Sequence, residues 1–292
     1  AMRRKAVDIL ARKLAPASLI TARGPSDPPP VAAGRLEPSR ATLAVLLSEP
    51  EDADAVLGVL GESDRVLLEV ADPARFTAER GFVPYFPTIT MDEVLPAYAA
   101  VAERAKHIVV NNSALIARDQ DAALRRWTAG PGFNLTNSEA FAAVSEAGGA
   151  AGGFLSAELN RDQVRSVLSG GSLAPSVKVW VPVFGPLTLM TTMQCLAKGR
   201  CPKKSQDAEC FPLCATSAEI RDEAGNRFHI LKRPWFQTAV YNALPLSLPQ
   251  AVAELREIAH VFVVDLRRLP PLNLSPASRS ELVRVFRGLL DP

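Results

Sequence analysis

The stretches VKVWVPVF (177–184) and HVFVVDL (260–266) decide the fold of this chain. Each is a short run of β-branched and aliphatic residues, which predicts a strand. Six similar runs precede them: TLAVLLS (42–48), RVLLEV (65–70), FVPYF (82–86), HIVVN (107–111), GFNLT (132–136) and GGFLS (152–156). Helix-like runs alternate with these strands, and eight such alternations imply a parallel sheet.

Closing this sheet on itself gives an α/β protein with a (β/α)8 TIM-like barrel. Barrels of this kind have about 250 residues, which matches the length of 41–292. An open, doubly wound sheet is the alternative architecture. The alternation is interrupted once, between strands 7 and 8, by an insertion at about 185–259 that contains all four cysteines. Because barrel enzymes build their sites where the strands end, this insertion lies where chemistry is expected.

Three helices between the strands have recognisable starts. In each, a hydroxyl residue is followed three residues later by a Glu, so the two side chains can cap each other's backbone amides. These starts are Thr90-Met91-Asp92-Glu93, Thr136-Asn137-Ser138-Glu139 and Ser278-Arg279-Ser280-Glu281.

Residues 1–40 are expected to precede the barrel as a separate segment. MRRKAVDILARK (2–13) is typical of a short amphipathic helix, and GPSDPPPVAAGRLEPS (24–39) of a proline-rich connector. The chain is 48% hydrophobic with a formal net charge of +2, which indicates a globular protein rather than a polycation. No apolar run approaches the roughly 18 residues of a membrane span, and no secretory signal is recognisable. We therefore expect a cytoplasmic protein with no membrane partner.

The four cysteines cluster in MQCLAKGRCPKKSQDAECFPLC (193–214), with spacings C-x5-C-x8-C-x3-C. In a cytosolic protein such a cluster favours metal ligation over disulfides, because the compartment keeps thiols reduced. The candidate ligands are Cys195, Cys201, Cys210 and Cys214. The spacing is not diagnostic, so three interpretations remain open: an iron–sulfur cluster held by all four thiolates, a structural zinc, or cysteines without a metal.

Polar residues at the predicted strand ends could line the barrel mouth. Asn111, Asn112, Asn134 and Asn137 could orient a substrate there, or could simply cap helices and form turns. Glu158 follows an apolar strand and could act as a general base or bind a substrate hydroxyl, with a structural hydrogen bond as the alternative.

Three charged residues follow the eighth strand. Asp265, Arg267 and Arg268 occupy the region that often binds phosphate or carboxylate in such barrels. We therefore expect them to bind an anionic substrate, with a surface ion pair as the alternative. The chain shows no G-x-S-x-G or H-E-x-x-H motif and no convincing Cys–His arrangement, so its residues give no support for a peptidase.

Several motifs, in order, resemble the U32 family, long called collagenase-like peptidases. FNLTNSEA (133–140) resembles its F-N-x-x-N-S-x-A, SAEL (156–159) its S-x-E-L, and VFGPLTLM (183–190) its V-F-G-R-x-P-L-M, with Pro186 in place of the Arg. IRDEAGNRFHI (220–230) resembles L-x-D-R-x-G-x-x-F-x-V, and VYNALPLSL (240–248) resembles I-Y-N-S-x-P-L-x-L.

The resemblance implies a barrel unit of a longer U32 protein that carries a [4Fe–4S] cluster. It implies oxygen-independent hydroxylation of a base in ribosomal or transfer RNA, or of a quinone precursor, with a small molecule such as prephenate as hydroxyl donor. Asp222 joins Glu158 as a catalytic candidate, and Asn242 joins Asn134 and Asn137 as a substrate-binding candidate. The alternatives are a U32-type peptidase and a non-catalytic RNA-binding or assembly domain with a structural metal such as zinc.

Overall fold

The computed structural model describes residues 41–76, 79–118, 126–169, 173–174, 176–196, 201, 218–233 and 237–291. The helix and connector predicted within 1–40 lie outside the described residues. So do two of the four predicted metal ligands, Cys210 and Cys214.

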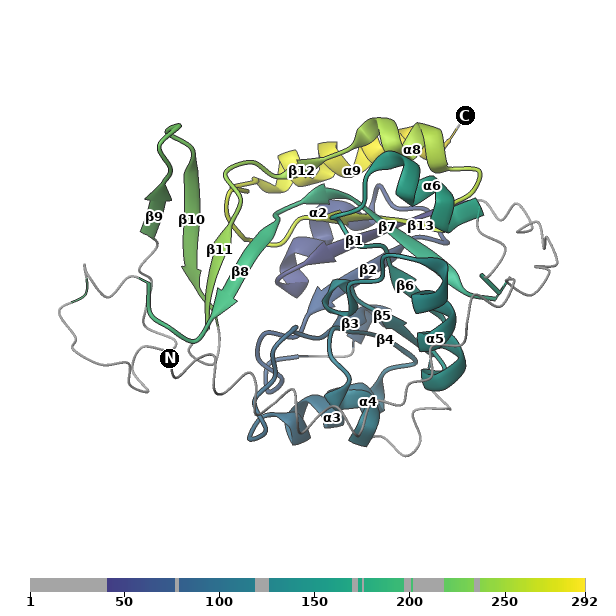
Figure 1. Ribbon diagram of the computed structural model, residues 1–292, viewed down its shortest axis with the longest axis horizontal. Coiled ribbons are helices and arrows are strands. Elements are labelled where there is room, and N and C mark those ends of the chain that lie inside the picture. Colours follow the sequence, from purple (N-terminus) through teal and green to yellow (C-terminus); the bar gives the residue numbers. More distant parts are fainter. Residues whose placement is uncertain are drawn as a thin grey trace, which may run out of the picture. The chain divides into compact units, whose positions relative to one another are not determined.

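Eight parallel strands form a closed barrel (Figure 1). They are β1 (Thr42–Leu47), β2 (Arg65–Glu69), β3 (Val83–Tyr85), β4 (His107–Val110), β5 (Arg126–Ala129), β6 (Gly152–Phe154), β7 (Lys178–Gly185) and β13 (Val261–Asp265). β13 pairs with both β7 and β1, and β7 also pairs with β6, so the sheet has no open gap between its first and last parallel strands. The predicted (β/α)8 TIM-like barrel is confirmed.

The fifth strand was predicted at the wrong place. The run 132–136 is not a strand, and β5 lies earlier, where the buried Trp127 packs outward. Pro131 opens a 3-10 turn, η4 (Pro131–Phe133), and Asn134 follows with φ 48°. Since proline cannot donate to a ladder and a positive φ breaks the extended backbone, pairing is reduced to a single bridge from Leu135 to Leu155.

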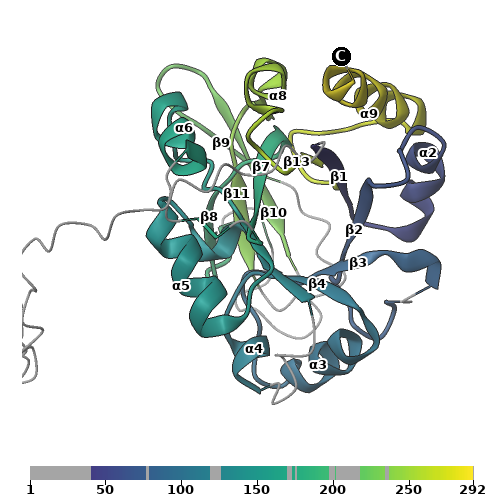
Figure 2. The same cartoon turned by 90° about the vertical axis from the view of Figure 1, so that its right-hand side faces the viewer.

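Helices cover the outside of the barrel (Figure 2). They are α2 (Asp54–Leu57), α3 (Leu95–Arg104), α4 (Ala114–Arg118), α5 (Ser138–Gly148), α6 (Arg161–Ser169), α8 (Pro249–Leu255) and α9 (Pro276–Leu290), with 3-10 helices η1 (Pro50–Ala53) and η2 (Glu79–Gly81). Alternate strand residues pack outward against these helices in one core and inward in a second, smaller core. Among the described residues, no helix is both long and apolar enough to cross a membrane.

The predicted helix starts were shifted or absent. α5 is capped by Asn137, whose side chain accepts from the Ala140 amide at 2.8 Å, one residue after the predicted start. α9 begins three residues early because Ser275 caps it and Pro276 fits the first helical position. α3 begins at Leu95 without a side-chain cap.

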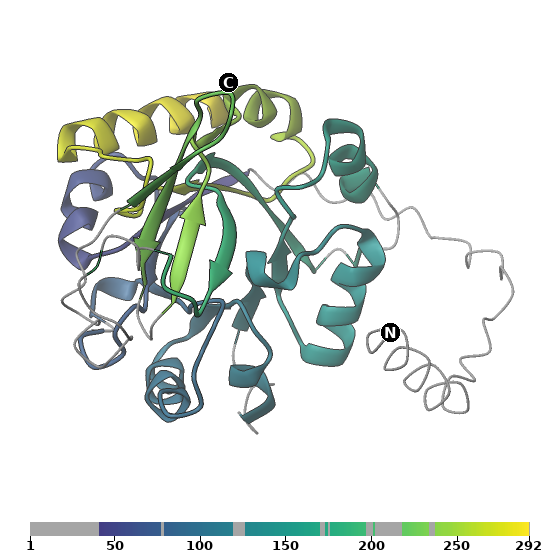
Figure 3. The same ribbon diagram turned by 60° about the vertical axis from the view of Figure 1, so that its left-hand side comes forward.

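The predicted insertion lies between β7 and β13, the seventh and eighth barrel strands. It contains an antiparallel four-stranded sheet with the order β8-β11-β10-β9 (Figure 3). Its strands are β8 (Thr188–Thr192), β9 (Ala218–Arg221), β10 (Arg227–Lys232) and β11 (Thr238–Tyr241). β12 (Leu246–Ser247) then returns to pair with β7, and α8 is the ordinary helix that leads to the last barrel strand. We call this four-stranded unit the inserted sheet.

Candidate functional site

Polar side chains face the barrel axis at the carboxyl ends of the strands. Residues two positions earlier in these strands belong to the inner core, and side chains on a strand alternate between its faces. The inward-facing end positions are therefore polar on three strands, with Glu69 on β2, Tyr85 on β3 and Asp265 on β13. This is the face on which (β/α)8 barrels hold their sites.

Four charged residues interact at this mouth, and we call them the mouth network: Glu69, Arg233, Asp265 and Arg267. Arg267 donates from Nη1 to Glu69 Oε1 at 2.7 Å and from Nη2 to Asp265 Oδ2 at 2.7 Å. Its Nε also donates to Asp265 Oδ1 at 3.0 Å. Arg233 donates to the same Oε1 of Glu69. The side chains are only 4% exposed for Glu69, 14% for Arg267, 15% for Asp265 and 19% for Arg233, so water screens these pairs weakly.

The charge states in the mouth network are fixed by its pairing. Burial by itself raises the pKa of the Glu69 carboxyl, but the charges and hydrogen bonds of Arg233 and Arg267 outweigh burial and hold it below its usual value. Burial likewise raises the pKa of the Tyr85 phenol to about 12. The Arg267 guanidinium lies 5.2 Å from the centre of that ring. At neutral pH the mouth therefore holds an ionised Glu69 and a protonated Tyr85.

The inserted sheet is anchored to the mouth. Arg233 directly follows β10 and reaches Glu69 at the end of β2. Ala239 and Tyr241 of β11 pack against Leu269, which lies beyond β13. The inserted sheet therefore contributes an arginine to the barrel's own polar site.

Asn111, expected to line the mouth, forms a side-chain hydrogen bond with Tyr85 and also holds two loops together. Its Nδ2 donates to the Phe86 carbonyl at 2.6 Å and its Oδ1 accepts from the Gly132 amide at 3.0 Å. A Cβ added to Gly132 would lie 2.1 Å from the Asn111 carbonyl oxygen, so only glycine allows this approach.

The structure separates the predicted anion-binding residues. Asp265 and Arg267 meet in the mouth network, as described above. Arg268 is 56% exposed and pairs with Asp52 at 2.8 Å, which the buried Arg279 also contacts at 2.8 Å. Arg268 thus takes part in an ion pair beside helix α9 rather than in the mouth network.

The predicted asparagines lie at turns and caps. Asn134 is exposed with a left-handed backbone, and Asn137 is exposed and caps α5. Asn242 is half-buried, and its backbone N–H donates to the Leu187 carbonyl at 2.9 Å.

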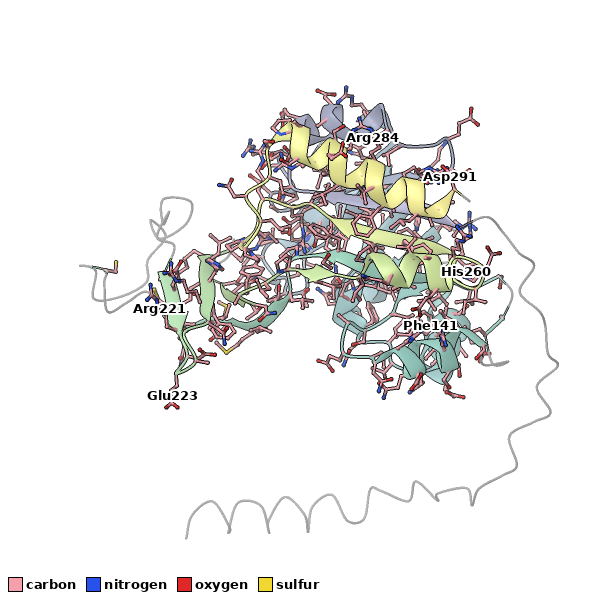
Figure 4. All side chains as sticks on the ribbon, turned by 90° about the horizontal axis from the view of Figure 1, so that it is seen from above. Phe141, Arg221, Glu223, His260, Arg284 and Asp291 are labelled. Atoms are coloured by element: carbon pink, nitrogen blue, oxygen red, sulfur yellow. The ribbon has the colours of Figure 1, made fainter. Side chains whose placement is uncertain are left out.

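The two predicted catalytic carboxylates are both exposed. Glu158 follows β6 in a turn, where its amide donates to Ser156 Oγ at 3.2 Å. Asp222 lies in the turn between β9 and β10, and its carboxylate accepts from the backbone and side chain of Asn226 at 2.8 and 2.7 Å. These hydrogen bonds hold the pKa of Asp222 below its usual value. Its neighbours Arg221 and Glu223 are seen at the tip of the hairpin (Figure 4).

Two of the four cysteines are within the described residues. Cys195 and Cys201 are both free and half-buried. Cys195 follows β8 and packs against Ile230 and Val240, on one face of the inserted sheet. Among the described residues, no three potential metal ligands come together. Thiolates are ligands that suit either an iron–sulfur cluster or zinc, and the predicted ligands Cys210 and Cys214 lie outside the described residues.

Three residues of the mouth were missed from the sequence: Glu69, Tyr85 and Arg233. Glu69 had a usable signal, because it is the only carboxylate in the apolar run RVLLEV (65–70). Arg233 had none, since its role depends on how the inserted sheet packs.

Comparisons with known proteins identify no family for this chain. No protein-family model and no curated protein matches this sequence. A solved structure with a similar chain is a cube-shaped, highly porous protein cage designed by fusing symmetric oligomeric domains. The two chains are 12% identical, with a TM-score of 0.47, over 86% of this chain and 72% of the other.

Proposed function

We propose that this chain is a diverged U32-type barrel that carries a [4Fe–4S] cluster and acts in oxygen-independent hydroxylation, with RNA as the substrate class. The observation that carries the proposal is the anchoring of the inserted sheet at the barrel mouth. Through Arg233 and Glu69, the unit that presents Cys195 is joined to the polar site at the strand ends.

The ligands in this proposal are Cys195, Cys201, Cys210 and Cys214. When bound, such a cluster supplies one-electron redox chemistry. The half-buried, apolar setting of Cys195 supports a cluster, because protection from solvent tunes the potential of iron–sulfur centres.

The two arginines of the mouth network have different roles in this proposal. Arg267 donates hydrogen bonds from Nε, Nη1 and Nη2 to Asp265 and Glu69, so its role is to position these two carboxylates. The Arg233 guanidinium makes one hydrogen bond among the described residues, from Nη2 to Glu69. We therefore assign Arg233 to the anionic group of the substrate, which is either an RNA phosphate or a carboxylate of a donor such as prephenate. The buried Tyr85, which lies against Arg267, keeps its phenolic proton at neutral pH.

A second candidate, a non-catalytic RNA-binding or assembly domain with a structural zinc, is favoured by one observation. Both carboxylates of the mouth network are neutralised by arginines, whereas Glu158 and Asp222 are exposed. Within the mouth network both carboxylates are therefore held by arginines, and neither is available as a general base.

The peptidase alternative has less support. The histidines contact groups other than a cysteine thiol: His107 bonds Thr128, His260 accepts from the Val179 amide, and His229 lies 3.8 Å from Glu219.

Mapping of modified bases tests the leading proposal. A strain lacking the gene should lose one hydroxylated base in ribosomal or transfer RNA, measured by mass spectrometry of nuclease digests. The wild-type chain and the control Arg227→Gln, on exposed β10 surface, should restore it, whereas Cys195→Ser and Arg233→Gln should not. An unchanged set of bases would contradict hydroxylation, and retained salt-sensitive RNA binding would then favour the second candidate.

A further inference from the structure

The amino end of the barrel presents cations toward the barrel axis. On β2, Leu67 belongs to the inner core, so Arg65, two residues earlier, faces the same way. On β7, Trp180 belongs to the inner core, and Lys178 precedes it by the same spacing. Both basic side chains lie at the first position of their strands and are exposed.

β4 and β5 add a histidine and a third cation to the same end. Val109 lies in the inner core, which turns His107 inward. Trp127 packs outward, so its neighbour Arg126 faces the axis. His107 and Arg126 are direct partners in the register of the two strands. Arg65, Arg126 and Lys178, with His107 beneath them, form what we call the amino face.

In the part of the chain that the structure describes, no carboxylate pairs with the cations of the amino face. Among the described residues, none of the three forms an ion pair, although other exposed arginines such as Arg161 do so. Arg65 donates from Nη1 to the backbone carbonyls of Ser63 and Asp64, each at 2.9 Å. These bonds fix the arginine in place without neutralising it.

Polar groups lie beneath the three cations. His107 Nε2 and Thr128 Oγ1 share a hydrogen bond of 2.9 Å. The Trp180 ring lies 6.0 Å from the His107 ring, and the buried Trp180 Nε1 has no hydrogen-bond partner among the residues that the structure describes. Burial and then the charges of Arg126, Arg65 and Lys178 lower the pKa of His107 to about 4. All three cations therefore lie close enough to lower the pKa of the same imidazole, and His107 is neutral at pH 7.

We propose that the amino face binds a phosphate-type oxyanion between Arg65, Arg126 and Lys178. Three neighbouring cations repel one another when, as among the described residues, no carboxylate lies between them, and a bound anion removes that repulsion. Guanidinium groups match the oxygens of phosphate in pairs, and lysine adds a point charge. This site is at the opposite end of the barrel from the mouth network and does not depend on the function proposed there.

Nuclear magnetic resonance of the histidine rings tests this site on the full chain. His107 is assigned with His107→Gln, and His229, which faces Glu219 on the inserted sheet, is the internal reference. The chain is titrated first with inorganic phosphate and then with a short single-stranded RNA. Saturable shifts of the His107 ring and a rise in its pKa are expected, because a bound anion offsets the three cations.

Charge variants show whether binding is specific. Arg126→Gln and Lys178→Gln should each weaken phosphate binding about tenfold, because each removes one charge-assisted hydrogen bond to the anion. Lys106→Gln is the matched control, because it also removes one positive charge next to His107 in the sequence. Lys106 is not one of the charges that lower the pKa of His107, so this variant should bind phosphate like the wild type. Circular dichroism confirms that each variant is folded.

Each outcome decides the proposal. Saturation by inorganic phosphate alone identifies a free small anion as the source, and saturation by RNA alone identifies a nucleic-acid backbone. No movement of His107 with either probe would overturn the site. Equal weakening by Lys106→Gln would also overturn it, because the effect would then be general charge.

Discussion

Replacing Arg267 by methionine should destabilise the protein strongly. The change removes three hydrogen bonds to Asp265, at 2.7, 3.0 and 3.1 Å, and one to Glu69 at 2.7 Å. Methionine keeps much of the side-chain volume, so the effect isolates the lost charge. Removing one partner of a buried ion pair costs about 3–5 kcal/mol. Because Asp265 is 15% exposed, we expect the lower end, about 3 kcal/mol, or a drop of roughly 6–12 °C in Tm.

The pH dependence identifies the cause. The folded-state pKa of Glu69 is held low, so its contribution to stability is present above the unfolded carboxyl pKa of about 4.3 and is lost as the pH falls through the folded value. Without Arg267, burial is less compensated and the Glu69 pKa rises. The difference in unfolding free energy between the wild type and Arg267→Met should therefore be largest at pH 7 and smaller near pH 5.

The neighbouring residue supplies a matched control. Arg268 is 56% exposed, and its partner Asp52 keeps Arg279, so Arg268→Met should cost about 1 kcal/mol or less. Urea unfolding followed by circular dichroism measures all three proteins at both pH values. Equal costs for the two variants, or a cost for Arg267→Met that does not change with pH, would refute this explanation of the mouth network.

Two further changes test the surrounding structure. Gly132→Ala should cost about 1–3 kcal/mol, because its Cβ would meet the Asn111 carbonyl, whereas Gly58→Ala, with open space around it, should be nearly neutral in the same thermal unfolding assay. Asn137→Ala should cost about 1 kcal/mol as the loss of the α5 cap and leave RNA affinity unchanged. A weaker RNA affinity without loss of stability would instead make Asn137 a binding residue.

The barrel strands were predictable because each is a short apolar run, and the single error among them has a local cause. Around β5 the apolar run continues past the strand into a Gly-Pro-Gly turn, so hydrophobicity alone placed the strand too late. Helix starts were less predictable, since several polar residues near each start can act as the cap.

The mouth was predicted only where its residues follow a strand in sequence. Asp265 and Arg267 are two residues apart and were found together. Glu69 is 198 residues from Arg267 and 164 from Arg233, and only the closing of the barrel and the docking of the inserted sheet bring them together. Asp222 was predicted to be catalytic because it belongs to a motif. In the structure its carboxylate accepts hydrogen bonds within a hairpin turn, and an Asp followed shortly by Gly and Asn is also typical of such a turn.

Metal analysis of anaerobically purified full-length protein tests the central claim most directly. An iron–sulfur protein should be brown and contain about four irons per chain, and Cys195→Ser and Cys201→Ser should lose them while remaining folded. Colourless protein with about one zinc per chain would contradict the cluster and favour a structural metal.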